Sequence, residues 1–330
     1  MKKLRLGIVG CGKVTDLCYL PMSSLVPEIE ISVLVDTDAS RVAALAEMYS
    51  IPHWTGSIEE TYDKLDAVII ALPNHLHAPV SIEYLKRGIH VLVEKPMAIN
   101  AEECTEMIEA AGKTKSILAV AHMRRYYPLL QYMSRIIQTG IVGDIQSFDF
   151  SEGTVWRWES MSDYRFKKEK GGGIFADMGS HLIDTALWWF GDIKEIKYFD
   201  DSRGGVEANF SLEITLPNNA KGTIEVSTNR QLRNSFKVIG DRGTLECGTA
   251  PHGPISLRSK GTDIDIPVLK DPDFENFGFL EAFAKQYRMF YKSIADGNDD
   301  LIPNGYVGRR TVEIIEMAFQ NRNKLLYPWE

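Results

Sequence analysis

The chain has 330 residues, which is enough for two domains of ordinary size. Hydrophobic residues make up 44% and charged residues 25%, a composition typical of a globular protein and not of a disordered chain or a coiled coil. The formal net charge of −8 argues against the broadly basic surface that a non-specific binder of nucleic acid or anionic membranes needs, so we expect neither partner.

Short apolar runs alternate with helix-forming segments over the first third of the chain. The predicted strands are 4–9, 31–35, 66–72, 90–93 and 116–121, and the predicted helices are 38–49, 75–87 and 101–112. Strands that are apolar throughout are typical of a parallel sheet covered by helices on both faces. We therefore predict an α/β Rossmann-type domain with a parallel sheet at residues 1–123.

The pattern changes after residue 123. A helix is predicted at 126–139, and longer strands with alternating polarity follow at 146–154, 207–216, 221–228 and 235–239. Three more helices are predicted at 174–190, 276–295 and 305–321. Alternation indicates one buried and one solvated face, so residues 124–330 are predicted to form an α+β domain with a large open, mainly antiparallel sheet.

A glycine-rich turn, GIVGCGKV at 7–14, follows the first predicted strand and opens a helix. Gly10 permits a tight turn, and Gly12 lets the backbone approach a pyrophosphate at the helix N-terminus. Thr15 stands where the full dinucleotide-binding pattern has its third glycine. Taken alone, the turn also fits a plain strand–helix connection.

An acidic residue at the end of the second strand favours dinucleotide binding. Asp36 lies 24 residues after Gly12, where a carboxylate accepts hydrogen bonds from the adenosine ribose. A carboxylate there repels the 2′-phosphate of NADP, and Thr37 and Asp38 add no positive charge. Arg41 is the one basic residue close by, and we expect it to face solvent. The predicted cofactor is NAD, with NADP disfavoured.

Three further segments make the pattern specific: ALPNHLH at 71–77, EKP at 94–96 and GGGIFADMGSHLID at 171–184. Together with the glycine turn they resemble the Gfo/Idh/MocA oxidoreductases, the family of glucose–fructose oxidoreductase and inositol dehydrogenase, over the whole chain. The resemblance implies a Rossmann domain followed by an open-sheet domain, with substrate bound between the two near the nicotinamide. It also implies that subunits pack sheet to sheet, so we expect a homodimer or homotetramer.

The resemblance implies roles for individual residues. The implied catalytic group is Lys95, Asp177 and His181. The implied cofactor contacts are Gly10, Gly12, Lys13, Val14, Asp36, Thr37, Ala71, Pro73, Asn74, His77, Glu94 and Lys95. Met123 stands where many relatives carry an asparagine, so a polar contact usual at that place is not expected here.

The chemistry of hydride transfer suits these residue types. Oxidation of a carbinol requires a base for the hydroxyl proton, and histidine has a pKa near neutrality. His181 is four residues after Asp177, so on a helix the two share a face, and Asp177 either orients the imidazole or binds a neighbouring substrate hydroxyl. Lys95 lies at the carboxyl edge of a parallel sheet, where its cation reaches an oxygen that gains negative charge. Alone, His181 and Lys95 also fit a core histidine and a surface lysine.

Basic and aromatic residues around the triple glycine are candidate substrate contacts. The expected substrate-binding residues are Arg125, Arg157, Tyr164 and Arg165. The cluster with Arg157 and Arg165 either binds a phosphate, as a nucleotide sugar would require, or forms a solvated basic patch. The pair His75 and His77 has no further ligand nearby in sequence, so no metal site is expected.

These observations predict an NAD(H)-dependent oxidoreductase that transfers a hydride between nicotinamide and a hydroxyl or keto carbon of a sugar, nucleotide sugar or cyclitol. Two alternatives remain: an NAD-retaining, glycosidase-like enzyme that acts by transient oxidation and elimination, and a catalytically silent NAD-binding regulatory protein. The four cysteines form no CxxC pair, so we expect reduced thiols and a cytoplasmic protein.

Overall fold

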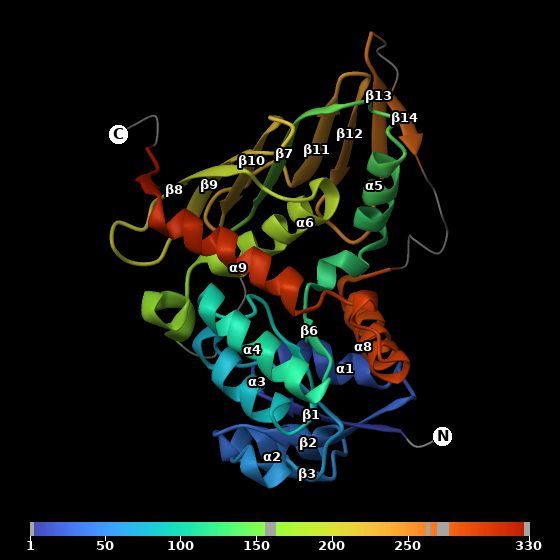
Figure 1. Ribbon diagram of the computed structural model, residues 1–330, viewed down its shortest axis with the longest axis vertical. Coiled ribbons are helices and arrows are strands. Elements are labelled where there is room, and N and C mark those ends of the chain that lie inside the picture. Colours follow the sequence, from blue (N-terminus) through green and yellow to red (C-terminus); the bar gives the residue numbers. More distant parts are fainter. Residues whose placement is uncertain (1–2, 156–162, 262–264, 269–276, 327–330) are drawn as a thin grey trace.

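The computed structural model describes residues 3–155, 163–261, 265–268 and 277–326. The first part of the chain forms a six-stranded parallel sheet with the order β3-β2-β1-β4-β5-β6 (Figure 1). Its strands are β1 Leu4–Val9, β2 Ile29–Val35, β3 His53–Thr55, β4 Ala67–Ile70, β5 His90–Val93 and β6 Leu118–Val120. The helices of this part are α1 Leu20–Ser23, α2 Ala39–Met48, α3 His77–Leu85 and α4 Ala101–Thr114.

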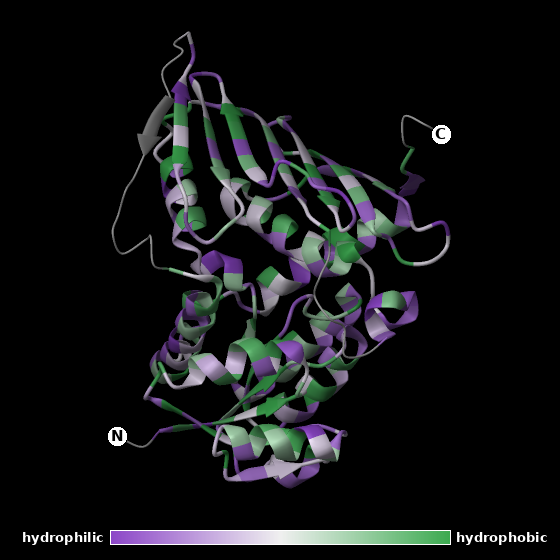
Figure 2. Ribbon diagram, turned by 180° about the vertical axis from the view of Figure 1, so that it is seen from behind, coloured by the Kyte–Doolittle hydropathy of each residue, from purple (hydrophilic) through white to green (hydrophobic). Residues whose placement is uncertain are grey.

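Both faces of this sheet are buried, as the uniformly apolar strands predict. All four residues of β4 are buried, and its successive side chains enter two different hydrophobic clusters. Ile69 belongs to one cluster, whereas Val68 and Ile70 belong to the other. The apolar colour of the central strands is visible in Figure 2. The predicted α/β domain with a parallel sheet is confirmed.

The second sheet has nine strands within the described residues, in the order β14-β13-β12-β11-β7-β10-β9-β8-β15. Neighbouring strands are antiparallel except for β7 with β10 and β8 with β15. This confirms a large, mainly antiparallel sheet. Its strands are β7 Ile145–Gly153, β8 Glu195–Asp200, β9 Asn209–Thr215, β10 Lys221–Ser227, β11 Ser235–Gly240, β12 Gly243–Gly248, β13 Ile255–Ser259, β14 Asp265–Val268 and β15 Arg322–Lys324.

One face of the second sheet is apolar and covered by helices. Phe210, Leu212 and Ile214 on β9 are all buried, whereas Ser211 and Glu213 between them are more exposed. Phe210 packs edge-on against Phe175 with ring centroids 4.8 Å apart, just before helix α6, Ser180–Phe190. Figure 2 shows the resulting alternation of colour along the strands. The alternating apolar positions therefore face the core of this domain.

Three further helices follow in the second half of the chain. They are α5 Pro128–Gln138, α8 Phe279–Asp296 and α9 Gly305–Gln320. Helix α8 contacts α1, and helix α9 contacts α4 and β6 on one side and α6 and β8 on the other. Helix α9, which the sequence assigns to the second domain, therefore contacts elements of both sheets (Figure 1). No helix in the described ranges has the length and apolarity to cross a bilayer.

Candidate active site

A cavity of about 850 Å³ lies where the carboxyl ends of the parallel strands meet the second domain. Its wall includes all twelve expected cofactor residues, together with Asp177, His181, Tyr164 and Arg165. Two of the four expected substrate-binding residues are not found in this wall. Arg157 lies outside the described residues, and Arg125 is not part of the cavity wall. The fold thus gathers these wall residues from six separate sequence segments around one space.

The glycine turn has the geometry expected of a phosphate-binding loop. Gly10 has φ +99°, and an added Cβ would lie 2.3 Å from the carbonyl oxygen of Ala71, so only glycine fits. Nothing lies within 4 Å of an added Cβ at Gly12, which leaves its backbone open to a ligand. Thr15, in place of the third glycine, donates its hydroxyl to the carbonyl of Gly10 at 2.6 Å. The imperfect pattern therefore still makes a braced turn.

Asp36 is bound to the same turn. Its Oδ2 accepts the backbone N–H of Cys11 at 2.6 Å, and its Oδ1 accepts that of Asp38 at 2.9 Å. The prediction that Arg41 faces solvent is wrong. Asp38 caps helix α2, so Arg41 lies in the first turn, where its guanidinium contacts the Cys11 carbonyl and pairs with Asp16 at 3.2 Å.

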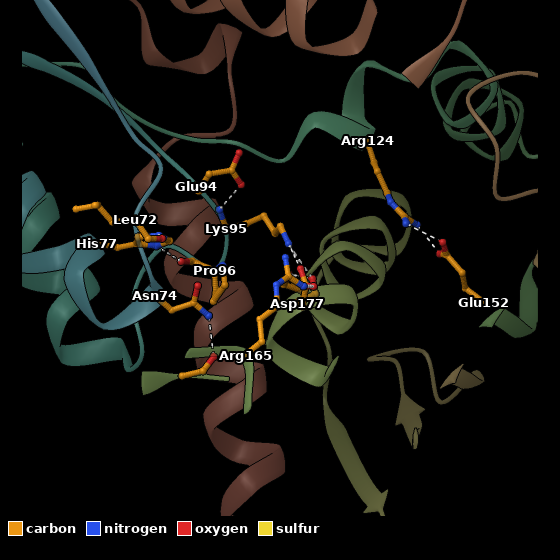
Figure 3. Close-up of polar contacts among 12 residues, drawn as sticks. Leu72, Asn74, His77, Glu94, Lys95, Pro96, Arg124, Glu152, Arg165 and Asp177 are labelled. Carbon is orange, nitrogen blue, oxygen red and sulfur yellow. Dashed lines mark hydrogen bonds and ion pairs between the residues drawn. The ribbon is translucent and has the colours of Figure 1, made fainter. Parts of the chain in front are cut away.

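Lys95, Asp177 and Arg165 form one ionic cluster (Figure 3). Lys95 Nζ lies 2.5 Å from Asp177 Oδ1 and 3.1 Å from the Asp177 carbonyl oxygen. Arg165 donates to the other carboxylate oxygen, Oδ2. The Lys95 and Asp177 side chains are only 13% and 18% exposed. Two cations from opposite sides of the cavity therefore share one carboxylate.

The charges in this cluster set the protonation of the site. Burial alone would raise the pKa of Asp177, but Lys95 and Arg165 lower it to about 2, so the carboxylate is ionised. Burial, followed by the charges of Lys95 and Arg124, holds the pKa of His181 well below its usual range. At neutral pH the imidazole is therefore neutral and able to accept a proton.

Asp177 does not orient the imidazole of His181. Each carboxylate oxygen of Asp177 accepts a hydrogen bond from a cation, Oδ1 from Lys95 and Oδ2 from Arg165. Such charge-assisted hydrogen bonds are stronger than a hydrogen bond to a neutral imidazole. His181 Nδ1 is buried, and no described residue lies within hydrogen-bond distance of it. His181 is part of the cavity wall, so Nε2 is the ring nitrogen left for a ligand. The segment Phe175–Gly179, which carries Asp177, is π-helical and continues into α6.

The two adjacent arginines have different environments. Arg125, an expected substrate contact, pairs with the buried Asp184 at 2.8 Å, so its charge is used inside the protein. Arg124, which the sequence analysis did not select, lies in the cavity wall and bonds Glu152 through two contacts of 2.6 and 2.8 Å (Figure 3). Nothing in the local sequence distinguishes Arg124 from Arg125, so it could not be predicted which of the two lies in the cavity wall.

Three other expected cofactor residues also support the loops around the cavity. Both ring nitrogens of His77 lie 2.8 Å from carbonyl oxygens, those of Leu72 and Pro96. Asn74 Nδ2 donates to the carbonyl of Gly171 at 2.7 Å, which links the two domains. Glu94 accepts the hydroxyl of Tyr19 at 2.7 Å, and burial raises its pKa. Within the described part of the chain, no three His, Cys, Asp or Glu side chains group as metal ligands.

Two family models match this chain. The model of an oxidoreductase family with an NAD-binding Rossmann fold matches residues 4–122, and the GFO/IDH/MocA C-terminal domain matches residues 130–246. The inositol 2-dehydrogenase of Corynebacterium glutamicum is 25% identical over 316 residues, covering 93% of this chain and 90% of that protein. The levoglucosan dehydrogenase of Pseudarthrobacter phenanthrenivorans is 26% identical over 286 residues, or 74% and 73% of the two chains.

Solved structures share the fold. A levoglucosan dehydrogenase in complex with NADH and levoglucosan has a TM-score of 0.85 at 22% identity, covering 97% of this chain and 98% of that one. A WlbA dehydrogenase from Chromobacterium violaceum with NADH and UDP-GlcNAcA has a TM-score of 0.84 at 23% identity, covering 97% and 94%. With both domains matched in order, the chain belongs to the GFO/IDH/MocA family of NAD-dependent oxidoreductases.

Proposed function

We propose that this protein transfers a hydride between NAD and a hydroxyl or keto carbon of a sugar or cyclitol, with His181 as the base and Lys95 as the cation beside the reacting oxygen. The observation that carries the proposal is a buried histidine, His181, in the wall of the same cavity as the Lys95–Asp177 ion pair. When bound, NAD supplies the carbon that accepts or donates the hydride.

The residues present fit this cofactor. The open backbone at Gly12 suits a pyrophosphate, and the carboxylate of Asp36 lies at the rim where the adenosine ribose would bind. Asp36 and Asp38 repel a 2′-phosphate, and Arg41, a cation in the same part of the cavity wall, already pairs with Asp16. The charge at this end of the cavity thus favours NAD over NADP.

His181 and Lys95 divide the work on the substrate oxygen. In the oxidising direction, His181 Nε2 accepts the hydroxyl proton while the hydride leaves the same carbinol carbon. The Lys95 ammonium stabilises the negative charge that develops on the oxygen. Asp177 and Arg165 fix the position of that ammonium through the shared carboxylate. In the reducing direction, protonated His181 returns the proton to the new alkoxide.

The charge balance of the cavity favours an uncharged polyol over a nucleotide sugar. Arg165 already bonds Asp177 and Arg124 already bonds Glu152, so the charge of each guanidinium is balanced by a carboxylate, which weakens its attraction for a phosphate. A levoglucosan dehydrogenase and an inositol 2-dehydrogenase are among the similar proteins, which fits a neutral sugar or cyclitol. The relative with UDP-GlcNAcA makes nucleotide sugars the second class to test.

The test is a screen of sugars, cyclitols and nucleotide sugars for NADH formation, repeated with His181→Ala and Lys95→Ala. Each variant should lower turnover by roughly 100-fold or more, while His181→Ala should keep its affinity for NADH. Near-wild-type turnover of His181→Ala would refute the assignment of the base. Elimination of a leaving group without net NADH would favour the glycosidase-like alternative, and NADH binding without any turnover would favour the regulatory one.

A further inference from the structure

A buried carboxylate supports the turn that leads into the helix of His181. Glu207 lies between β8 and β9, and its Oε1 accepts the backbone N–H of Phe175 at 2.8 Å. Its backbone carbonyl accepts the N–H of Ile174 at 3.3 Å. An added Cβ at Gly173, whose φ is +108°, would lie 2.3 Å from Glu207 Oε1. The third glycine of the triple-glycine turn therefore makes room for this carboxylate.

The position of this contact matters for the site. Phe175 is the first residue of the π-helical segment that carries Asp177 and continues into α6 with His181. The first N–H groups of a helix have no partner within the helix, and a carboxylate beside them also interacts favourably with the helix dipole. Glu207 thus satisfies an N–H group two residues before Asp177.

The carboxylate is itself held by the C-terminal strand. Arg322 on β15 bonds Asp200 through Nε, and its Nη2 lies 3.3 Å from Glu207 Oε2. Strand β15 pairs with β8, so the end of α9 lies beside the second sheet (Figure 1). The Asp200 and Glu207 side chains are each only 2% exposed. One guanidinium therefore joins two buried carboxylates beside the catalytic segment.

We propose that Glu207, held by Arg322, is a positioning residue that fixes the segment carrying Asp177 and His181 for hydride transfer. This inference rests on the function proposed above. It assigns no contact with substrate to Glu207; the residue acts through the Phe175 N–H. The turn that it holds faces the cavity through Gly173 and Asp177, so a small displacement there moves the reacting groups.

The pH dependence of turnover provides a specific readout. Burial, together with the charge of Asp200, raises the pKa of Glu207 to about 7, although the Phe175 N–H and Arg322 favour ionisation. Besides Asp200 and Arg322, the Tyr198 side chain also interacts electrostatically with Glu207. The pKa of His181 lies well below its usual range, and Glu94 is another buried carboxyl with a raised pKa. An acid limb of kcat near pH 7 is therefore assigned to Glu207 only if it disappears in Glu207→Gln, where Glu94 and His181 are unchanged.

The experiment compares Glu207→Gln and Arg322→Met with wild type. Each variant should lower kcat by about 10- to 100-fold with little change in KM for NAD, because the glycine turn and Asp36 are not touched. The acid limb near pH 7 should disappear in Glu207→Gln, and added guanidinium should partly rescue Arg322→Met. The control is Arg310→Met, which removes an α9 guanidinium that pairs with Asp192 and leaves kcat unchanged.

The outcomes separate this inference from the proposed function. If His181→Ala is inactive but Glu207→Gln keeps wild-type kcat and pH profile, the positioning role is wrong and the proposed base stands. If His181→Ala keeps near-wild-type turnover, the proposed assignment of the base is wrong, whatever the result for Glu207→Gln. Should Glu207→Gln fail to fold, Arg322→Met decides: lost kcat with guanidinium rescue supports the positioning role, and unchanged kcat overturns it.

Discussion

Replacing Arg165 with methionine tests how the carboxylate of Asp177 is kept ionised. Burial opposes ionisation, yet the pKa of Asp177 falls from the usual 3.8 to about 2 beside Lys95 and Arg165. A displacement of almost two pKa units corresponds to roughly 2.5 kcal/mol, and this is a lower bound on what the two cations supply, because burial acts against them. Removing one cation from a site whose side chains are 24% and 18% exposed should therefore cost about 1–2 kcal/mol at pH 7.

The sign of the pH effect follows from the direction of the shift. A carboxylate whose pKa is lowered by folding contributes stability above its unfolded pKa and loses that contribution as the pH falls toward the folded value. The difference between wild type and Arg165→Met should thus be constant above about pH 5 and should narrow toward pH 3. Urea unfolding followed by tryptophan fluorescence measures this difference directly.

A matched control lies in the same segment. Lys167 pairs with Asp163, whose pKa is also lowered to about 2, but the two side chains are 43% and 54% exposed. Solvent screens exposed pairs, so Lys167→Met should leave the urea midpoint unchanged. This prediction is wrong if Arg165→Met is as stable as wild type, or if Arg165→Met and Lys167→Met lower the free energy of unfolding equally. Either result would mean that shielding from solvent does not strengthen the ion pairs of Asp177.

Three further outcomes are expected. Gly12→Ala should keep the thermal midpoint of the free protein but lose most of its affinity for NADH in a fluorescence titration. Gly10→Ala should lower the thermal midpoint itself, because its Cβ would lie 2.3 Å from the carbonyl oxygen of Ala71. Asp36→Ser should weaken NADH binding and, with a basic residue at Thr37, shift preference toward NADP; a wild type that already prefers NADP contradicts this. Light scattering should give a dimer or tetramer, and a monomer at micromolar concentration contradicts the expected assembly.

Much of the first domain could be predicted because its strands carry their own signal. Four buried residues in a row, as in β4, have few alternatives to the centre of a parallel sheet. The same holds for Gly10, whose conformation no other residue adopts cheaply. The motif residues Lys95, Asp177 and His181 likewise come together at the cavity because each follows or begins a well-defined element.

The features that sequence analysis missed depend on contacts between distant segments. Strand β15, Arg322–Lys324, has no apolar alternation and exists because it pairs with β8. The directions of Arg41 and Arg124 were likewise set by partners, Asp16 and Glu152, which no local pattern links to them. The orientation of these polar side chains depends on charged partners that are distant in sequence, so the periodicity of the local sequence cannot predict it.

The low pKa of His181 is compatible with the role of base that we propose for it. Proton transfer depends on the difference between the pKa of the base and that of the substrate hydroxyl in the same site. Lys95 lowers the pKa of His181, but its ammonium also favours the alkoxide on the oxygen beside it and so lowers the pKa of the hydroxyl. In the proposed arrangement Lys95 lies beside the reacting oxygen, where its charge acts strongly because Coulomb energy rises as the distance shortens. The arrangement therefore keeps the base neutral at working pH while reducing the cost of removing the proton.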